Sequence, residues 1–170
     1  MSTAPDATLA EPILVTLDAV AVFAPLGIRY AIGGSLASSL HGKPRSTDDV
    51  DLVAEIGLAH VAPLCAAWGA SYYADDVLMR EAIRERSCFN IIHLATVLKI
   101  DVFIAGSDPL AREELTRARG HRVADDPPRE LMLAPAEDIV LQKLRGYRLG
   151  GGVSDRQWRD ILGVLAVRQR

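Results

Sequence analysis

Residues 30–53 read YAIGGSLASSLHGKPRSTDDVDLV, and this stretch begins with a short apolar strand that runs into Gly33-Gly34-Ser35. We expect a helix from there to about His41. Two glycines and a serine at a strand-to-helix turn present backbone N–H groups, a hydroxyl and the positive end of a helix, which together can hold a phosphate. A tight turn that requires glycine only for its backbone conformation would have the same sequence. A second motif is therefore needed before phosphate binding can be inferred.

The second motif follows after the spacer 36–48 and reads Asp49-Val50-Asp51-Leu52-Val53. Side chains alternate in a strand, so Asp49 and Asp51 share one face and lie about 7 Å apart along it. Two carboxylates in this position repel each other, which favours a cation between them. Mg²⁺ is the natural candidate, because it binds a few carboxylate oxygens together with water and substrate phosphates. The alternative is an edge strand with a solvated acidic face.

A third carboxylate lies in the otherwise apolar stretch Ile100-Asp101-Val102-Phe103-Ile104. Aspartate is depleted in strands and costly to bury unpaired, so Asp101 requires a ligand or a partner. We therefore take Asp49, Asp51 and Asp101 as candidate catalytic residues and metal ligands. Three acids on adjacent strands can hold one or two metal ions, and the third can help to deprotonate a nucleophile.

Short helices and strands alternate along the remaining chain, which indicates an α+β fold: a small mixed β-sheet flanked by helices, with a C-terminal helical pair. Asp125-Asp126-Pro127-Pro128 is the clearest break, so we expect a core with an N-terminal helix over 1–126 and a helical extension packed on it over 127–170, as one compact unit. Helices are predicted over about 10–23, 34–41, 58–68, 75–86, 135–148 and 154–167, and strands over 29–32 and 49–55 and twice within 89–104.

The composition fits a globular protein of 170 residues, with 49% hydrophobic and 24% charged residues and a net charge of −3. Residues 1–110 carry 7 basic and 13 acidic side chains, whereas residues 111–170 carry 12 and 9, so an acidic body precedes a mildly cationic end. Such a split suits a site where metal and phosphate meet. Cys65 and Cys88 form no disulfide or zinc pattern, and no leader or membrane-spanning stretch is visible, so we expect a cytoplasmic protein that does not contact a membrane.

The combination of these motifs resembles the nucleotidyltransferase superfamily of DNA polymerase β-like folds. The resemblance rests on Gly33-Gly34-Ser35, on Arg45-Ser46-Thr47-Asp48-Asp49-Val50-Asp51-Leu52 after a spacer of typical length, and on the later Asp101. The Arg-Ser-Thr-x-Asp-Val-Asp form is similar to small bacterial members, among them abortive-infection type toxins of toxin–antitoxin pairs. A looser match in the tail, Pro135 to Lys143-Leu144 and then Arg159-Asp160, extends the resemblance over roughly residues 28–165.

Lys143 lies between Ile139 and Tyr147 on the apolar stripe of its predicted helix, so it must either snorkel to solvent or meet an anion. The resemblance implies that it holds the nucleoside triphosphate together with Gly33, Gly34 and Ser35. For Asp160 we expect a solvated or capping charge. Arg45 can either pair with Asp48 or Asp49 or reach the phosphates, and we favour the ion pair.

The resemblance implies a Mg²⁺-dependent enzyme that transfers a nucleoside monophosphate from a nucleoside triphosphate to an acceptor hydroxyl. The acceptor stays open among RNA such as tRNA, a protein and a small molecule, and the toxin-like relatives add a cognate small protein as an expected partner. Two alternatives also stay open: a nucleotide-binding or partner-binding protein of the same fold without turnover, and the antitoxin component of a two-protein module.

Overall fold

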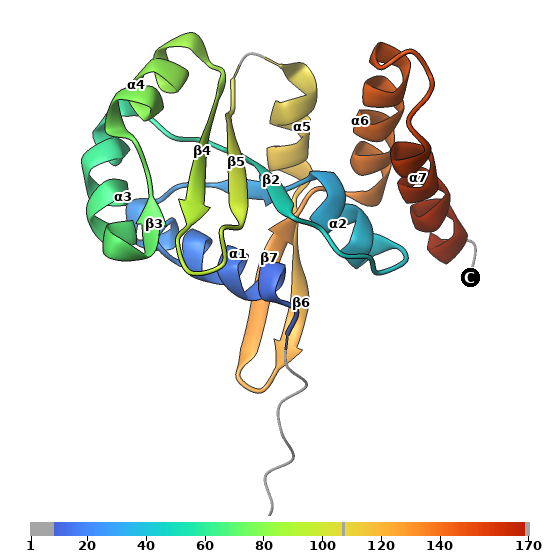
Figure 1. Ribbon diagram of the computed structural model, residues 1–170, viewed down its shortest axis with the longest axis horizontal. Coiled ribbons are helices and arrows are strands. Elements are labelled where there is room, and N and C mark those ends of the chain that lie inside the picture. The colour runs from blue at the N-terminus through green and yellow to red at the C-terminus, as the bar shows by residue number, and fades with distance from the viewer. Residues whose placement is uncertain (1–8, 107, 169–170) are drawn as a thin grey trace, which may run out of the picture.

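The structure of the protein, a computed structural model, describes residues 9–106 and 108–168 (Figure 1). Its α-helices are α1 (Glu11–Ala21), α2 (Gly34–His41), α3 (Val61–Trp68), α4 (Asp76–Glu85), α5 (Pro109–Arg117), α6 (Ala136–Leu149) and α7 (Asp155–Arg168). Its strands are β1 (Tyr30–Ile32), β2 (Asp49–Ala54), β3 (Tyr72–Tyr73), β4 (Cys88–His93), β5 (Lys99–Ile104), β6 (Arg119–Asp125) and β7 (Pro128–Leu133).

All of these strands join one mixed sheet in the order β3-β4-β5-β2-β1-β7-β6. The central strands β2 and β5 run parallel, while β1 and β4 pair antiparallel on either side of them. β7 pairs parallel with β1 and forms a hairpin with β6. The predicted α+β class with a mixed sheet and a C-terminal helical pair is confirmed.

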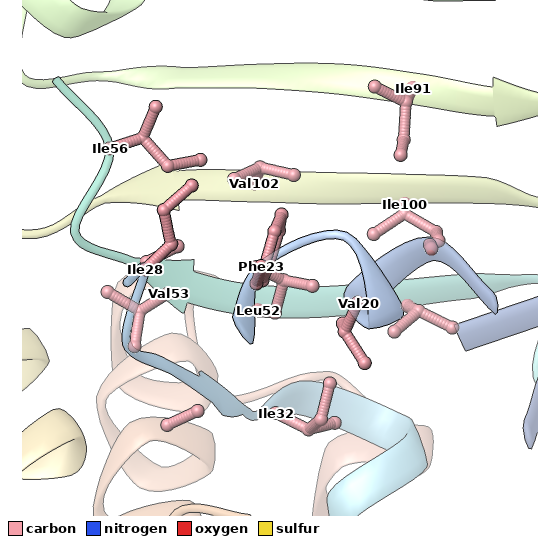
Figure 2. Close-up of a cluster of buried hydrophobic side chains, with 14 of the residues drawn as sticks. Val20, Phe23, Ile28, Ile32, Leu52, Val53, Ile56, Ile91, Ile100 and Val102 are labelled. Atoms are coloured by element: carbon pink, nitrogen blue, oxygen red, sulfur yellow. The ribbon is translucent and has the colours of Figure 1, made fainter. Parts of the chain in front are cut away.

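The apolar side of the central strands forms the core. Val50 and Leu52 of β2 are almost fully buried, as are Ile100 and Val102 of β5. Figure 2 shows these strands beside Val20 of α1 and Phe23, which follows that helix. The opposite side of the same strands carries Asp49, Asp51 and Asp101, which are only half-buried. Strand alternation therefore separates a dry core from a polar face.

The stretch 119–133 differs most from the sequence-based expectation. It forms the β6–β7 hairpin, whose turn contains the predicted boundary at 126/127, and β7 belongs to the same sheet as the strands before that turn. The predicted break at 125–128 therefore does not interrupt the sheet, because Pro128 begins β7 at its paired end opposite Asp125. α5 and β3 are further elements that the sequence patterns did not predict.

The helical pair packs on the core through α2. A Cβ atom on Gly42, directly after α2, would lie 2.8 Å from the backbone of Gly163 in α7, so the absence of a side chain permits this contact. α6 and α7 also touch each other through the Tyr147 and Trp158 rings, whose centroids are 5.5 Å apart. Within the described residues, no helix is long and apolar enough to cross a membrane.

Candidate active site

The turn between β1 and α2 lies directly against Asp51. The backbone N–H of Gly33 donates to the carbonyl of Asp51 at 2.9 Å, and Gly34 adopts a positive φ of 55°. A Cβ atom on Gly34 would clash with the Asp51 carboxylate. Glycine is therefore required here for two reasons, the backbone conformation and the close approach. The result is a helix N-terminus, with Ser35 buried in its first turn, beside a carboxylate.

The register of β2 and β5 places the predicted carboxylates on one face. Asp51 is the partner of Asp101 across the two parallel strands, and Asp49 is the partner of Lys99. Burial raises the pKa of Asp51, and the neighbouring charges of Asp49 and Asp101 raise it further. These groups repel each other in the absence of a cation, which is the condition under which a divalent ion binds well.

The carboxylates of Asp49 and Asp51 fit a hard divalent cation. They offer oxygen donors on one strand face, beside a helix N-terminus that can bring phosphate oxygens to complete the coordination shell. Asp101 is held differently, because one of its oxygens accepts a hydrogen bond from the Lys99 ammonium at 2.8 Å. Across residues 9–106 and 108–168, no three His, Cys, Asp or Glu side chains converge as a ready-made metal centre.

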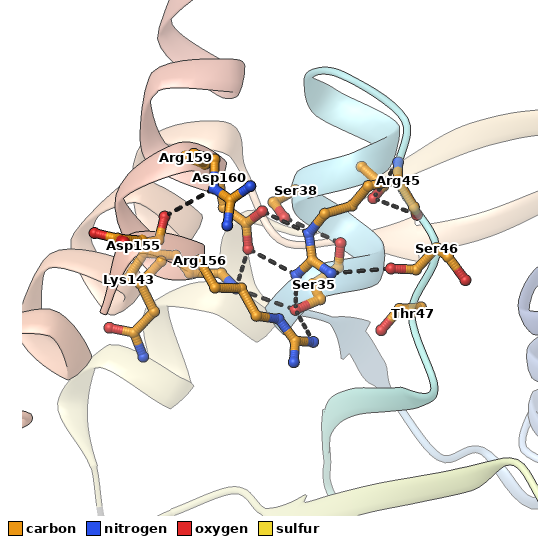
Figure 3. A network of polar contacts seen from close by, with 12 residues as sticks. Ser35, Ser38, Arg45, Ser46, Thr47, Lys143, Asp155, Arg156, Arg159 and Asp160 are labelled. Carbon is orange, nitrogen blue, oxygen red and sulfur yellow. Dashed lines mark hydrogen bonds and ion pairs between the residues drawn. The ribbon is translucent and has the colours of Figure 1, made fainter. Parts of the chain in front are cut away.

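Three cationic side chains gather around the Ser35 hydroxyl oxygen (Figure 3). Arg45 donates to it at 2.7 Å, Lys143 at 3.3 Å and Arg156 at 3.4 Å. We call these three residues with Ser35 the cation cluster. Its three cations come from the loop before β2 and from both C-terminal helices, and together with the α2 N-terminus they form a strongly anion-attracting position.

Asp160 of α7 holds the cation cluster together and corrects two expectations. Its carboxylate accepts from Arg45 at 2.7 and 2.9 Å and from Lys143 at 2.8 Å. Only 4% of this side chain is exposed, so Asp160 is not a solvated or capping charge. Arg45 is ion-paired with Asp160 rather than with Asp48 or Asp49, because the packing of α7 on α2 brings the carboxylate to the loop.

Of the two alternatives expected for Lys143, snorkelling to solvent or contact with an anion, the structure shows the second, and the anion is Asp160. Burial pushes the pKa of Asp160 upward, but hydrogen bonds from Arg45 and Lys143 outweigh burial, and the pKa of this carboxyl lies below its ordinary value. The acid stays ionised and keeps both cations in place.

The structure thus brings the predicted residues to one region: Gly33, Gly34, Ser35 and Lys143 on one side, and Asp49, Asp51 and Asp101 on the other. Sequence reasoning missed Lys99 and Arg156. Lys99 had a detectable signal, since Lys99-Ile100-Asp101 alternates in a strand and places the lysine on the aspartate's face. Arg156 had none, because its approach to Ser35 depends on the packing of α7.

A cavity of about 700 Å³ extends from this region between α5 and α6. Its lining includes Gly34, Asp51 and Val53 on the carboxylate side of the sheet, together with Phe103, Glu114 and Gln142. Glu114 is 2% exposed, and its Oε1 has no hydrogen-bond partner. Burial raises the pKa of Glu114 to about 8, and the charges of Asp138 and Asp108 add to the shift. Glu114 is therefore a buried acid beside the cavity, and its raised pKa favours the protonated form.

No family model matches the sequence, and no curated protein matches it either. Solved structures do resemble it. A nucleotidyltransferase-like protein from Paracoccidioides brasiliensis, an antigen, superposes with a TM-score of 0.61 at 20% identity, over 94% of this chain and 77% of that one.

Two antibiotic-related proteins are also similar. The lincosamide antibiotic adenylyltransferase LnuA, solved with lincomycin bound, gives a TM-score of 0.59 at 12% identity, over 94% of this chain and 98% of that one. The antibiotic-resistance factor ANT(2'')-Ia gives 0.52 at 14% identity, over 92% and 83%. The chain therefore has the fold of the nucleotidyltransferase superfamily.

Proposed function

We propose that this protein is a magnesium-dependent nucleotidyltransferase, which moves a nucleoside monophosphate from a nucleoside triphosphate to an acceptor hydroxyl. The observation that carries the proposal is the contact between two opposite electrostatic environments. The cation cluster surrounds Ser35, and the adjacent Gly34 lies against Asp51. A metal-bound triphosphate needs both, cations for its outer phosphates and carboxylates for the metal.

Each group of residues has a role in this proposal. The glycine turn, Ser35 and Lys143 bind the β- and γ-phosphates. Asp49 and Asp51 hold Mg²⁺, which when bound stabilises the negative charge of the reacting phosphate and promotes ionisation of the attacking hydroxyl. Asp101 lies next to them on β5 and accepts the proton of that hydroxyl.

The reaction forms a bond between the acceptor oxygen and the α-phosphorus. The bond from the α-phosphorus to the β-phosphate oxygen breaks, and pyrophosphate leaves with the electron pair. Attacking and leaving oxygens lie roughly in line in such transfers. With the leaving group at Ser35 and the acceptor at Asp101, the nucleoside must branch off along β2, where Val53 lines the cavity. We therefore assign the cavity to the nucleoside.

Three classes of acceptor are candidates for the transferred nucleotide. The bound antibiotic in LnuA and the resistance role of ANT(2'')-Ia support a small hydroxyl compound as one candidate. RNA such as tRNA and a protein remain candidates through the sequence resemblance to toxins, which also proposes a cognate small protein partner. Each of these acceptors and the triphosphate are available in the cytoplasm, where we place the protein.

The test is transfer of label from each α-labelled nucleoside triphosphate. Purified protein and Mg²⁺ are incubated with separate RNA, protein and small-molecule fractions of a bacterial extract. The Asp49→Asn/Asp51→Asn double variant serves as the inactive form, and Asp48→Asn, a change at the exposed neighbouring acid, is the matched control. Circular dichroism establishes that all three proteins are folded.

Label that enters one fraction with wild type and Asp48→Asn, and not with the double variant, supports the enzyme and identifies its acceptor class. Mg²⁺-dependent nucleotide binding without transfer to any fraction supports the non-catalytic alternative. Nucleotide binding that is equal in the double variant contradicts the metal assignment.

A further inference from the structure

Lys99 places a permanent positive charge inside the carboxylate site. It lies opposite Asp49 in the parallel register of β5 with β2, two residues before Asp101 and on the same face. Its ammonium is 2.8 Å from Asp101 Oδ2, while 17% of the Asp101 side chain is exposed. The backbone register fixes the position of Lys99 on this face, although 44% of its side chain is exposed.

The charges of the site balance with a single metal ion. Asp49, Asp51 and Asp101 carry three formal negative charges, and Lys99 neutralises one of them. One divalent cation compensates the remaining two. Arg45 and Lys143 share the carboxylate of Asp160, and the one net positive charge that remains lies at Ser35, the proposed phosphate position. Arg156 lies 3.8 Å from Asp49 but is more than half exposed and also approaches Ser35, the proposed phosphate position.

A second divalent ion at Asp101 would have to displace Lys99 or bind beside it. At about 4 Å, repulsion between a divalent and a monovalent cation weakens binding roughly 30-fold even at the dielectric constant of water. The described carboxylates agree with this conclusion, since Asp101 does not converge with Asp49 and Asp51 into a three-ligand group.

We infer that Lys99 replaces one of two metal ions, so that the site uses a single divalent cation held by Asp49 and Asp51. Lys99 then acts through Asp101 as a positioning residue: its 2.8 Å contact orients this carboxylate for the incoming hydroxyl. The inference rests on the proposed function, since it concerns the metal that the proposed transfer requires.

The experiment counts metal ions. Full-length protein is titrated with Mn²⁺, and free Mn²⁺ is measured by its EPR signal, first alone and then with a saturating α,β-methylene analogue of the preferred nucleoside triphosphate. Lys99→Met keeps the length of the side chain and removes its charge, while Lys99→Arg keeps the charge. Lys43→Met is the matched control, because Lys43 is an exposed lysine outside the site. Lys99→Gln replaces Lys99→Met if the latter does not fold.

We expect one Mn²⁺ per nucleotide complex for wild type, Lys99→Arg and Lys43→Met, and two for Lys99→Met. Without nucleotide, Lys99→Met should bind Mn²⁺ at least ten-fold more tightly than wild type. Two ions in the wild-type complex, or identical stoichiometry and affinity in Lys99→Met, overturn the inference and leave the proposed function intact. Absence of Mn²⁺ binding by wild type overturns the metal assignment of the proposed function, and the inference with it.

Discussion

Asp160→Asn tests whether the cation cluster is held by a buried acid. The substitution keeps the shape of the side chain but removes the ion-pair partner of Arg45 and Lys143. Breaking a buried ion pair from one side costs about 3–5 kcal/mol. Arg45 is 29% exposed and regains some hydration, so we expect the lower end, about 3 kcal/mol. For a chain of this size that loss lowers the melting temperature by roughly 6–12 °C.

The loss should depend on pH in a defined direction. The folded-state pKa of Asp160 is lowered, so its contribution to stability is complete above the unfolded-state pKa of about 3.9 and disappears as the pH falls through the folded value. Thermal unfolding of wild type and Asp160→Asn should therefore differ most at pH 5–8, and the two curves should approach each other below about pH 4.

Two further measurements separate this mechanism from a general packing defect. Asp155→Asn changes an exposed acid on the same helix and should cost less than about 1 kcal/mol, as expected for a first-turn charge. Added sulfate should narrow the gap between wild type and Asp160→Asn, since an anion at Ser35 can neutralise the two orphaned cations. A melting temperature for Asp160→Asn within 2 °C of wild type at pH 7 would refute the argument.

Three other substitutions give distinct outcomes. Glu114→Gln should be more stable than wild type, and the difference should grow from about pH 4.3 to pH 8 by up to about 1.4 kcal/mol per pH unit, because burial raises the folded-state pKa of Glu114 to about 8 while the unfolded chain loses this proton first. Urea midpoints of the two proteins that stay parallel over this range would contradict it. Gly34→Ala should lower the melting temperature by several degrees and abolish transfer, because the added Cβ clashes with Asp51 and the positive φ disfavours alanine. An active variant that is as stable as wild type would disprove the close approach of Gly34 to Asp51. Arg156→Ala should change the free energy of unfolding by less than about 0.5 kcal/mol but weaken triphosphate binding, measured by calorimetry, several-fold, whereas Arg148→Ala at an exposed position of α6 should change neither. Equal affinities in the two variants would remove Arg156 from the phosphate site.

The sequence predicted those parts of the site that local patterns specify. Gly33, Ser35, Asp49 and Asp51 belong to one strand-helix-strand stretch, where periodicity and glycine chemistry determine which side chains share a face. The long central helices and strands were predictable for the same reason.

The parts that were missed depend on contacts between distant segments. Arg45 and Asp160 are 115 positions apart, and nothing near either residue indicates the other. The β6–β7 hairpin has few buried side chains, so its strands lack the apolar alternation that identifies a strand. α5 did have a readable signal, since Asp108 caps the helix and Pro109 occupies its first position.

The electrostatics of the site favour a ligand that carries both charges over a free phosphate or a free metal ion. On one side, Asp160 neutralises one charge of the cation cluster and leaves the rest for an anion. On the other, burial and the charges of Asp49 and Asp101 raise the pKa of Asp51 even with Lys99 nearby, so a cation beside these carboxylates is favoured. A ligand that is negative at one end and carries a metal ion at the other satisfies both sides at once. A metal-bound nucleoside triphosphate has this charge distribution, so metal and nucleotide should each strengthen the binding of the other.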